Sequence, residues 1–201
     1  MPKYTPKGPI HPADELSFGQ ETFGQLNRLI GLARDQHGRV LALSLASFAE
    51  ECLGRLVKAY LRNAKTVHDL LEGFNAPLGT FAARIKMSYA LGLLTDSQFK
   101  DLELIRKIRN EFADTWDELS FDDAKLQGWI ENLDPPRFPQ VQPKTPEDKF
   151  RLVGVGILTE IEVLQSQLEE RKKRLKPIGI HVVKSTRMKS GIMKQEFEHV
   201  L

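Results

Sequence analysis

The chain has 201 residues, 41% of them hydrophobic and 28% charged, with a net charge of +2. These values are typical of a globular protein with one sizeable core, and no apolar run approaches the roughly 18 residues that a membrane span needs. The basic N-terminus has no apolar block behind it, as a secretory signal would have, so we expect a cytoplasmic protein without a membrane partner.

The small net charge conceals an uneven distribution. From Arg171 onward the chain has nine Lys and Arg residues against two Glu residues, a net charge of +7, so residues 1–170 carry −5. A mildly acidic body therefore precedes a basic C-terminal extension, an arrangement that can contact nucleic acid or an acidic partner.

The N-terminal half of the chain predicts an arm followed by helices. Four prolines within residues 1–16 predict an extended or disordered arm. Apolar residues spaced by three and four predict a first helix over 18–33, and a wider apolar face from Leu41 to Tyr60 predicts a central helix that is contacted on several sides.

The next segment has strong helix-start signals. Thr66 can cap a short helix that ends near Gly73, and a compact Asn-Ala-Pro-Leu-Gly turn follows. We predict a helix over 80–93, with Gly92 in its last turn. Thr95 and Gln98 form a capping box for a helix that reaches about Ala113.

The C-terminal half predicts a short helix after Ser120, a proline-rich irregular connection over 135–143, and a long helix from Thr145 to about Leu175. We therefore expect an all-α fold, a compact multi-helix bundle with a long C-terminal helix and extended N- and C-terminal arms. The predicted organisation is an arm over 1–16, a single all-helical domain over 17–176 and a basic tail over 177–201.

Catalytic chemistry has little support in the sequence. The five histidines are scattered, with no carboxylate or cysteine at the spacing of metal ligands. The single cysteine, Cys52, lies within an apolar helix pattern, which indicates a small buried hydrophobe rather than a nucleophile. We predict no catalytic residue, no metal site and no cofactor.

A cationic stretch on the helix that ends near Ala113 is the sharpest candidate for binding. Apolar residues supply one face of this helix, and the opposite face carries Arg106, Lys107, Arg109 and Asn110. We predict that these four residues bind an anion or a partner. The alternative is a solvated helix face in which Glu103 pairs with Lys107.

The basic tail supplies the candidates for contact with nucleic acid. They are Arg171, Lys172, Lys173, Arg174, Lys184, Arg187 and Lys189. With Phe197 as its single aromatic residue, the tail predicts salt-dependent and largely sequence-independent affinity for DNA. The alternative is an end that only keeps the protein soluble.

Three consecutive motifs, GFNAPLGTFAARIK, YALGLL and IRKIRNEFAD, resemble the signature of the mannitol operon repressor family of bacterial regulators. The resemblance covers residues 37–129. It implies a compact all-α protein in negative control of transcription, without an obvious DNA-binding motif, which acts through protein partners or accessory DNA contacts. Self-association into a homo-oligomer fits the wide apolar faces of the helices.

A second hypothesis comes from Arg109 to Asp114. This stretch resembles the Arg-to-His pattern at a helix end in the HEPN superfamily, which includes ribonucleases, and implies an RNA-binding or RNA-processing protein. However, Asp114 occupies the place of the histidine. An ionised carboxylate repels phosphate and cannot readily donate a proton, so we predict a non-enzymatic protein.

Overall fold

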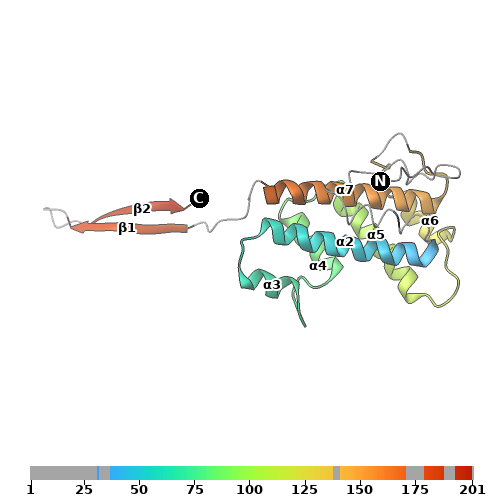
Figure 1. Ribbon diagram of the computed structural model, residues 1–201, viewed down its shortest axis with the longest axis horizontal. Helices are drawn as coiled ribbons and strands as arrows, with labels where there is room; N and C mark the ends of the chain where they lie inside the picture. The colour runs from blue at the N-terminus through green and yellow to red at the C-terminus, as the bar shows by residue number, and fades with distance from the viewer. Residues whose placement is uncertain (1–30, 32–36, 138–140, 171–178, 188–192, 201) are drawn as a thin grey trace, which may run out of the picture.

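The computed structural model describes residues 31, 37–137, 141–170, 179–187 and 193–200. These residues form a helical bundle and a separate two-stranded sheet (Figure 1). The elements are α2 Gly38–Tyr60, α3 Lys65–Leu71, α4 Phe81–Ala90, α5 Asp96–Asp114, α6 Ala124–Glu131, α7 Pro146–Glu170, β1 Gly179–Arg187 and β2 Met193–Val200. The prediction of an all-α bundle with a long C-terminal helix is confirmed.

Helices α2 and α7 form the centre of the bundle and run parallel. Gly38 contacts Glu147 at their first turns, and Cys52 contacts Glu162 further along. The two helices approach closely at Gly154, where an added Cβ would lie 2.6 Å from Cδ1 of Leu45. Every residue from Phe150 to Leu158 of α7 is buried, as expected for a helix covered on several sides.

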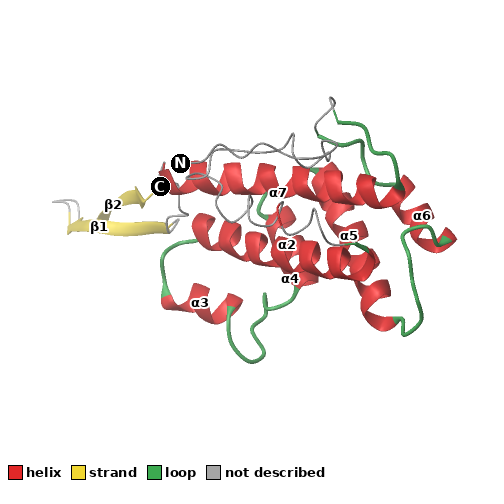
Figure 2. Ribbon diagram, turned by 45° about the vertical axis from the view of Figure 1, so that its right-hand side comes forward, coloured by secondary structure: helices red, strands yellow, loops and turns green. Residues whose placement is uncertain are grey.

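The remaining helices cover the α2–α7 pair. Helices α4 and α5 pack on α2, and α6 joins α5 to α7 (Figure 2). The predicted apolar face of α5 is buried at Leu102, Ile105, Ile108 and Phe112. Phe121, from the loop before α6, lies between Phe112 and Phe150, with ring centroids 4.9 and 5.0 Å apart. One large core cluster therefore holds most of the bundle together, and a smaller cluster of Val57, Val67 and Leu71 packs α3 against α2.

Most of the predicted helix starts are confirmed by their caps. The Thr80 hydroxyl accepts from the Ala83 N–H, Thr95 and Gln98 form the capping box, and the Thr145 hydroxyl accepts from the Asp148 N–H at 3.0 Å. Asp123 occupies the cap position before α6, but its carboxylate accepts from the Ser120 N–H and closes a turn there.

Two local predictions are wrong. Helix α3 begins at Lys65 after Ala64, so Thr66 lies inside the helix and does not cap it. Helix α4 ends at Ala90, and Gly92 adopts a φ of +70° outside it. This left-handed conformation ends the helix and carries little cost for glycine.

The C-terminal arm contains regular structure that the sequence analysis did not predict. Strand β1 pairs antiparallel with β2, with a bulge between Val182 and Lys184. The predicted arm over 1–16 and most of the predicted helix over 18–33 lie outside the described residues, as does the end of the long helix beyond Glu170. The domain boundaries at 17 and 176 therefore stay predictions.

Candidate functional site

The polar side of α5, away from its buried apolar face, carries Arg106, Lys107, Arg109 and Asn110, which we call the α5 lip. Its members differ in their partners. Arg106 Nη2 lies 2.7 Å from Glu103 Oε2. Arg109 Nη1 donates to Asn110 Oδ1 at 3.0 Å. Lys107 is exposed and has no ion-pair partner among the described residues. The alternative pairing of Glu103 with Lys107 is wrong, because Glu103 pairs one position earlier, with Arg106.

Two cations of the lip, Lys107 and Arg109, therefore remain without a carboxylate within the described part of the chain. Lys107 is exposed, and Arg109 is half-buried. Asp114 lies five positions after Arg109, a turn of about 140° around the helix axis, so the two side chains leave α5 in different directions. Arg109 and Asp114 therefore do not face each other as a pair of catalytic groups would.

The structure places few of the basic-tail candidates. Lys184 and Arg187 lie in β1, at register positions opposite Glu196 and Met193. The other candidates lie outside the described residues: Arg171, Lys172, Lys173, Arg174 and Lys189. Contact of the tail with DNA stays a prediction.

A feature that the sequence analysis missed is Trp116, just after α5, whose residue surface is 98% exposed. The guanidinium of Arg39, on the first turn of α2, donates to the carbonyls of Thr115 at 2.5 Å and Asp117 at 3.3 Å. The backbone on both sides of the tryptophan is thus held while its ring lies in solvent. The available signal was a tryptophan in an otherwise polar, acidic segment.

A groove of about 490 Å³ lies at the same end of the bundle, between the first turns of α2 and α7 and the loop before α6. Its lining includes the carboxylates of Asp122, Glu147 and Asp148, together with the buried Arg151. Glu147 and Asp148 both pair with Arg151, at 2.6 and 3.0 Å. The groove is lined by more acidic than basic groups.

A second exposed aromatic residue, Phe74, lies within the first motif of the family resemblance. It is 98% exposed, in a turn flanked by Gly73 with a φ of +106° and Asn75 with a φ of +62°. These left-handed conformations favour glycine and asparagine at the two positions. The turn returns the chain from α3 toward α4.

The same motif has a folding role through Arg84 of α4. Its guanidinium donates to three backbone carbonyls, those of Leu78 at 2.9 Å, Glu50 at 2.9 Å and Leu71 at 3.0 Å. These carbonyls belong to the turn before α4, to α2 and to the end of α3. Arg84 therefore connects three segments that the chain separates by up to 34 positions.

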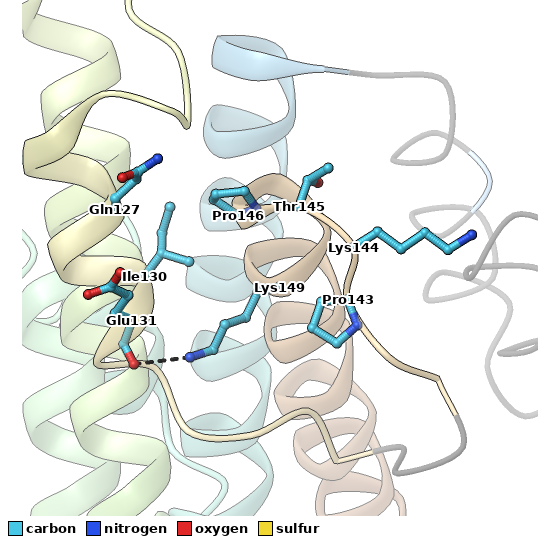
Figure 3. Close-up of a pocket in the computed structure, with 8 residues that line it drawn as sticks. All are labelled: Gln127, Ile130, Glu131, Pro143, Lys144, Thr145, Pro146 and Lys149. Carbon is cyan, nitrogen blue, oxygen red and sulfur yellow. Dashed lines mark hydrogen bonds between the residues drawn. The ribbon is translucent and has the colours of Figure 1, made fainter.

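A smaller cavity of about 300 Å³ lies between α6 and the start of α7 (Figure 3). Pro143 and Pro146 form one wall, and Lys149 extends across toward α6, where its Nζ donates to the Glu131 carbonyl at 3.0 Å. This bond satisfies a carbonyl at the end of α6, which is a structural task. The cavity contains no arrangement for catalysis.

Cys52 is fully buried, as predicted, but it belongs to a polar contact between α2 and α7. Its thiol donates to Glu162 Oε1 at 3.1 Å, and Arg55 Nη2 contacts the same carboxylate. Burial, and then the charge and hydrogen bond of Glu162, raise the pKa of the Cys52 thiol far above its ordinary value. A thiol in this state is a poor nucleophile.

Within the described ranges, no three His, Cys, Asp or Glu side chains gather in a group that could hold a metal ion. None of the helices in this part of the chain is long and apolar enough to cross a membrane.

Comparison with known proteins assigns the bundle to a family. A family model described as "Mannitol repressor" matches residues 56–168, more than half of the chain. The chain belongs to the mannitol repressor family. The match spans the end of α2 through nearly all of α7, so the α5 lip, Trp116 and Arg84 lie within it.

Individual relatives agree with this assignment. The mannitol operon repressor of Escherichia coli strain K12 is 32% identical over 83 residues, which cover 38% of this chain and 41% of that protein. The protein of the same name from Escherichia coli O6:H1 gives the same values. The match therefore spans less than half the length of either curated repressor.

A solved structure shares the fold. It is the X-ray structure of the MtlR–HPr complex from Escherichia coli, with a TM-score of 0.50 and 21% identity, covering 75% of this chain and 99% of that chain. This likeness supports the all-α architecture of the bundle.

Proposed function

We propose that this chain is a non-enzymatic negative regulator of transcription that acts in the cytoplasm through a protein partner. The observation that carries the proposal is the family match over residues 56–168, since the relatives are named as repressors. The described residues offer exposed binding surfaces rather than a catalytic centre, which agrees with a regulator that works by association.

The proposed partner is an HPr protein, or a protein of the same fold, from the same cell. The solved relative was captured as a complex with HPr. In this chain the α5 lip is the proposed contact, because Lys107 and Arg109 lie outside the core without carboxylate partners among the described residues. Lys107 is exposed and Arg109 is half-buried, and unpaired cations on a surface steer and bind an acidic partner surface.

Titration calorimetry with purified HPr tests the proposal. We expect Lys107→Ala plus Arg109→Ala to weaken binding about tenfold or more, since each lost charge contact costs on the order of 1 kcal/mol. Lys86→Ala plus Lys144→Ala removes two exposed charges elsewhere and should leave the affinity unchanged. Equal affinity of the lip variant and the wild type, or no binding by either, would contradict the proposal.

RNA cleavage distinguishes the regulator proposal from the HEPN-like alternative. We expect no RNA cleavage by the purified protein, because Asp114 is exposed, leaves α5 in a different direction from Arg109 and lacks a histidine's proton-transfer chemistry. Cleavage of a structured RNA that disappears in Arg109→Ala would replace the regulator proposal with a ribonuclease.

A further inference from the structure

The end of the bundle around Trp116 has the properties of an unoccupied docking surface. Trp116 is 98% exposed, although burying a tryptophan ring is among the largest single contributions that a side chain makes to an interface. Arg39 holds the carbonyls on both sides of it. Because the backbone is already held, a partner that covers the ring loses little free energy to ordering this loop.

The charges around the ring indicate the kind of partner that fits. The segment 114–123 carries five acids and no Lys or Arg. All five are exposed: Asp114, Asp117, Glu118, Asp122 and Asp123. The adjoining groove adds Glu147 and Asp148, and the nearby Lys125 already pairs with Glu111 at 2.7 Å. We call Trp116 and the five acids of segment 114–123 the Trp116 surface. The negative charge of this surface complements a cationic segment.

The chain itself contains such a segment. Residues 171–201 carry a net charge of +7 and include β1 and β2. An isolated two-stranded hairpin is at best marginally stable in water, so this segment gains from packing against another surface. Its cations complement the Trp116 surface, and an Arg or Lys stem can also cover a tryptophan ring.

The position of the two parts favours a contact between copies. Trp116 is tied to the first turn of α2, and α2 and α7 start side by side, so the Trp116 surface lies at the N-terminal end of α7. The basic segment follows Glu170, at the other end of α7. A helix of this length separates its ends by about 36 Å. Figure 1 shows β1 and β2 on the side opposite the start of α2.

We propose that the basic segment 171–201 of one copy docks on the Trp116 surface of a second copy. Stacking on Trp116 would supply the apolar part of the contact, and the five acids would pair with the Lys and Arg residues that follow Glu170. The contact goes beyond the proposed function, because it uses neither the α5 lip nor HPr. The association is electrostatic at its rim and should weaken with salt.

Sedimentation equilibrium on the full chain, at about 50 mM and about 500 mM salt, tests the proposal. We expect reversible self-association at low salt, a tenfold or larger rise in the dissociation constant for Trp116→Ala, and weaker association of the wild type at high salt. Phe74→Ala is the matched control, because it removes an equally exposed aromatic ring from another turn, and it should leave the dissociation constant unchanged. Circular dichroism should show unchanged helix content for both variants.

Charge reversal identifies the two sides of the contact. Asp117→Lys plus Glu118→Lys should abolish self-association, and so should Lys172→Glu plus Lys173→Glu. A chain that carries all four substitutions should associate again, because the charges are exchanged. A wild type that stays monomeric at low salt, equal association of Trp116→Ala and the wild type, or no recovery in the fourfold variant would overturn the proposal.

Discussion

The backbone N–H of Gly38 donates to Glu147 Oε2 at 3.1 Å, so a carboxylate on the first turn of α7 satisfies the first turn of α2. The other oxygen of Glu147 accepts from Arg151 Nη2 at 2.6 Å and lies 2.7 Å from His37 Nδ1. One side chain therefore sets the relative position of the two central helices at the end of the bundle that carries the Trp116 surface.

We expect Glu147→Ala to lower the free energy of unfolding by about 2 to 3 kcal/mol. The substitution removes a helix cap and one carboxylate partner of Arg151, which is only 3% exposed and keeps Asp148. Urea denaturation followed by circular dichroism measures the loss. Glu72→Ala is the control: it breaks exposed pairs with Lys58 and His68 and should cost less than about 1 kcal/mol. Equal losses in both variants would show that the cap contributes nothing.

Arg84→Ala should destabilise the bundle by about 3 kcal/mol. Three backbone carbonyls lose a charged donor at once, and a hydrogen bond to a charged group contributes about 1.5 kcal/mol or more before relaxation. The same urea measurement applies. Lys86→Ala, two positions later on α4 and exposed, should stay within about 0.5 kcal/mol of the wild type. A loss below about 1 kcal/mol for Arg84→Ala would mean that water replaces these bonds.

The raised pKa of Cys52 predicts a pH dependence with a definite sign. The folded chain keeps the thiol proton at pH values where the unfolded chain, with an ordinary pKa of 9.0, releases it. Stability from this group is therefore fully present below about pH 9 and falls above it, by up to about 1.4 kcal/mol per pH unit. Unfolding measured from pH 8 to 10.5 should show a shallower decline in Cys52→Ala than in the wild type. Parallel curves would contradict the prediction.

The basic tail predicts weak, salt-dependent affinity for duplex DNA. Fluorescence anisotropy with a labelled duplex should show a binding constant that falls steeply between about 50 and 200 mM salt. Lys184→Ala plus Arg187→Ala should weaken binding at low salt and reduce the salt slope, whereas Lys86→Ala plus Lys144→Ala should change neither. If the tail docks on the Trp116 surface, Trp116→Ala should bind DNA more tightly than the wild type, because the tail is released.

The helices of the bundle were largely predictable because their signals are local. Thr95 and Gln98 bond within one turn, Thr145 caps the helix that follows it, and the apolar face of α5 repeats along 14 residues from Phe99 to Phe112. Where the local signal was weaker, the prediction failed. Thr66 had the right residue type for a cap, but the cap position of α3 is Ala64, two residues earlier.

The candidate site was predicted only in part. Residue type and helix periodicity placed the α5 lip outside the core, yet they could not choose between Arg106 and Lys107 as the partner of Glu103, since both lie within one turn of it. Trp116 was missed, because a tryptophan ordinarily predicts burial. The backbone on both sides of it is held by Arg39, which is 77 positions away in the chain.

By itself, the sequence determined the all-α class, most helix starts and the apolar face of α5, since each depends on residues within a few turns of one another. The tertiary structure alone decided which carbonyls Arg84 binds, that Glu147 caps α2, and that Trp116 lies in solvent beside an acidic groove. Apart from the bond of Arg84 to the Leu78 carbonyl, which spans six positions, these contacts join residues 13 to 109 positions apart. No local pattern encodes such pairs, because they form only when packing of the core brings distant segments together.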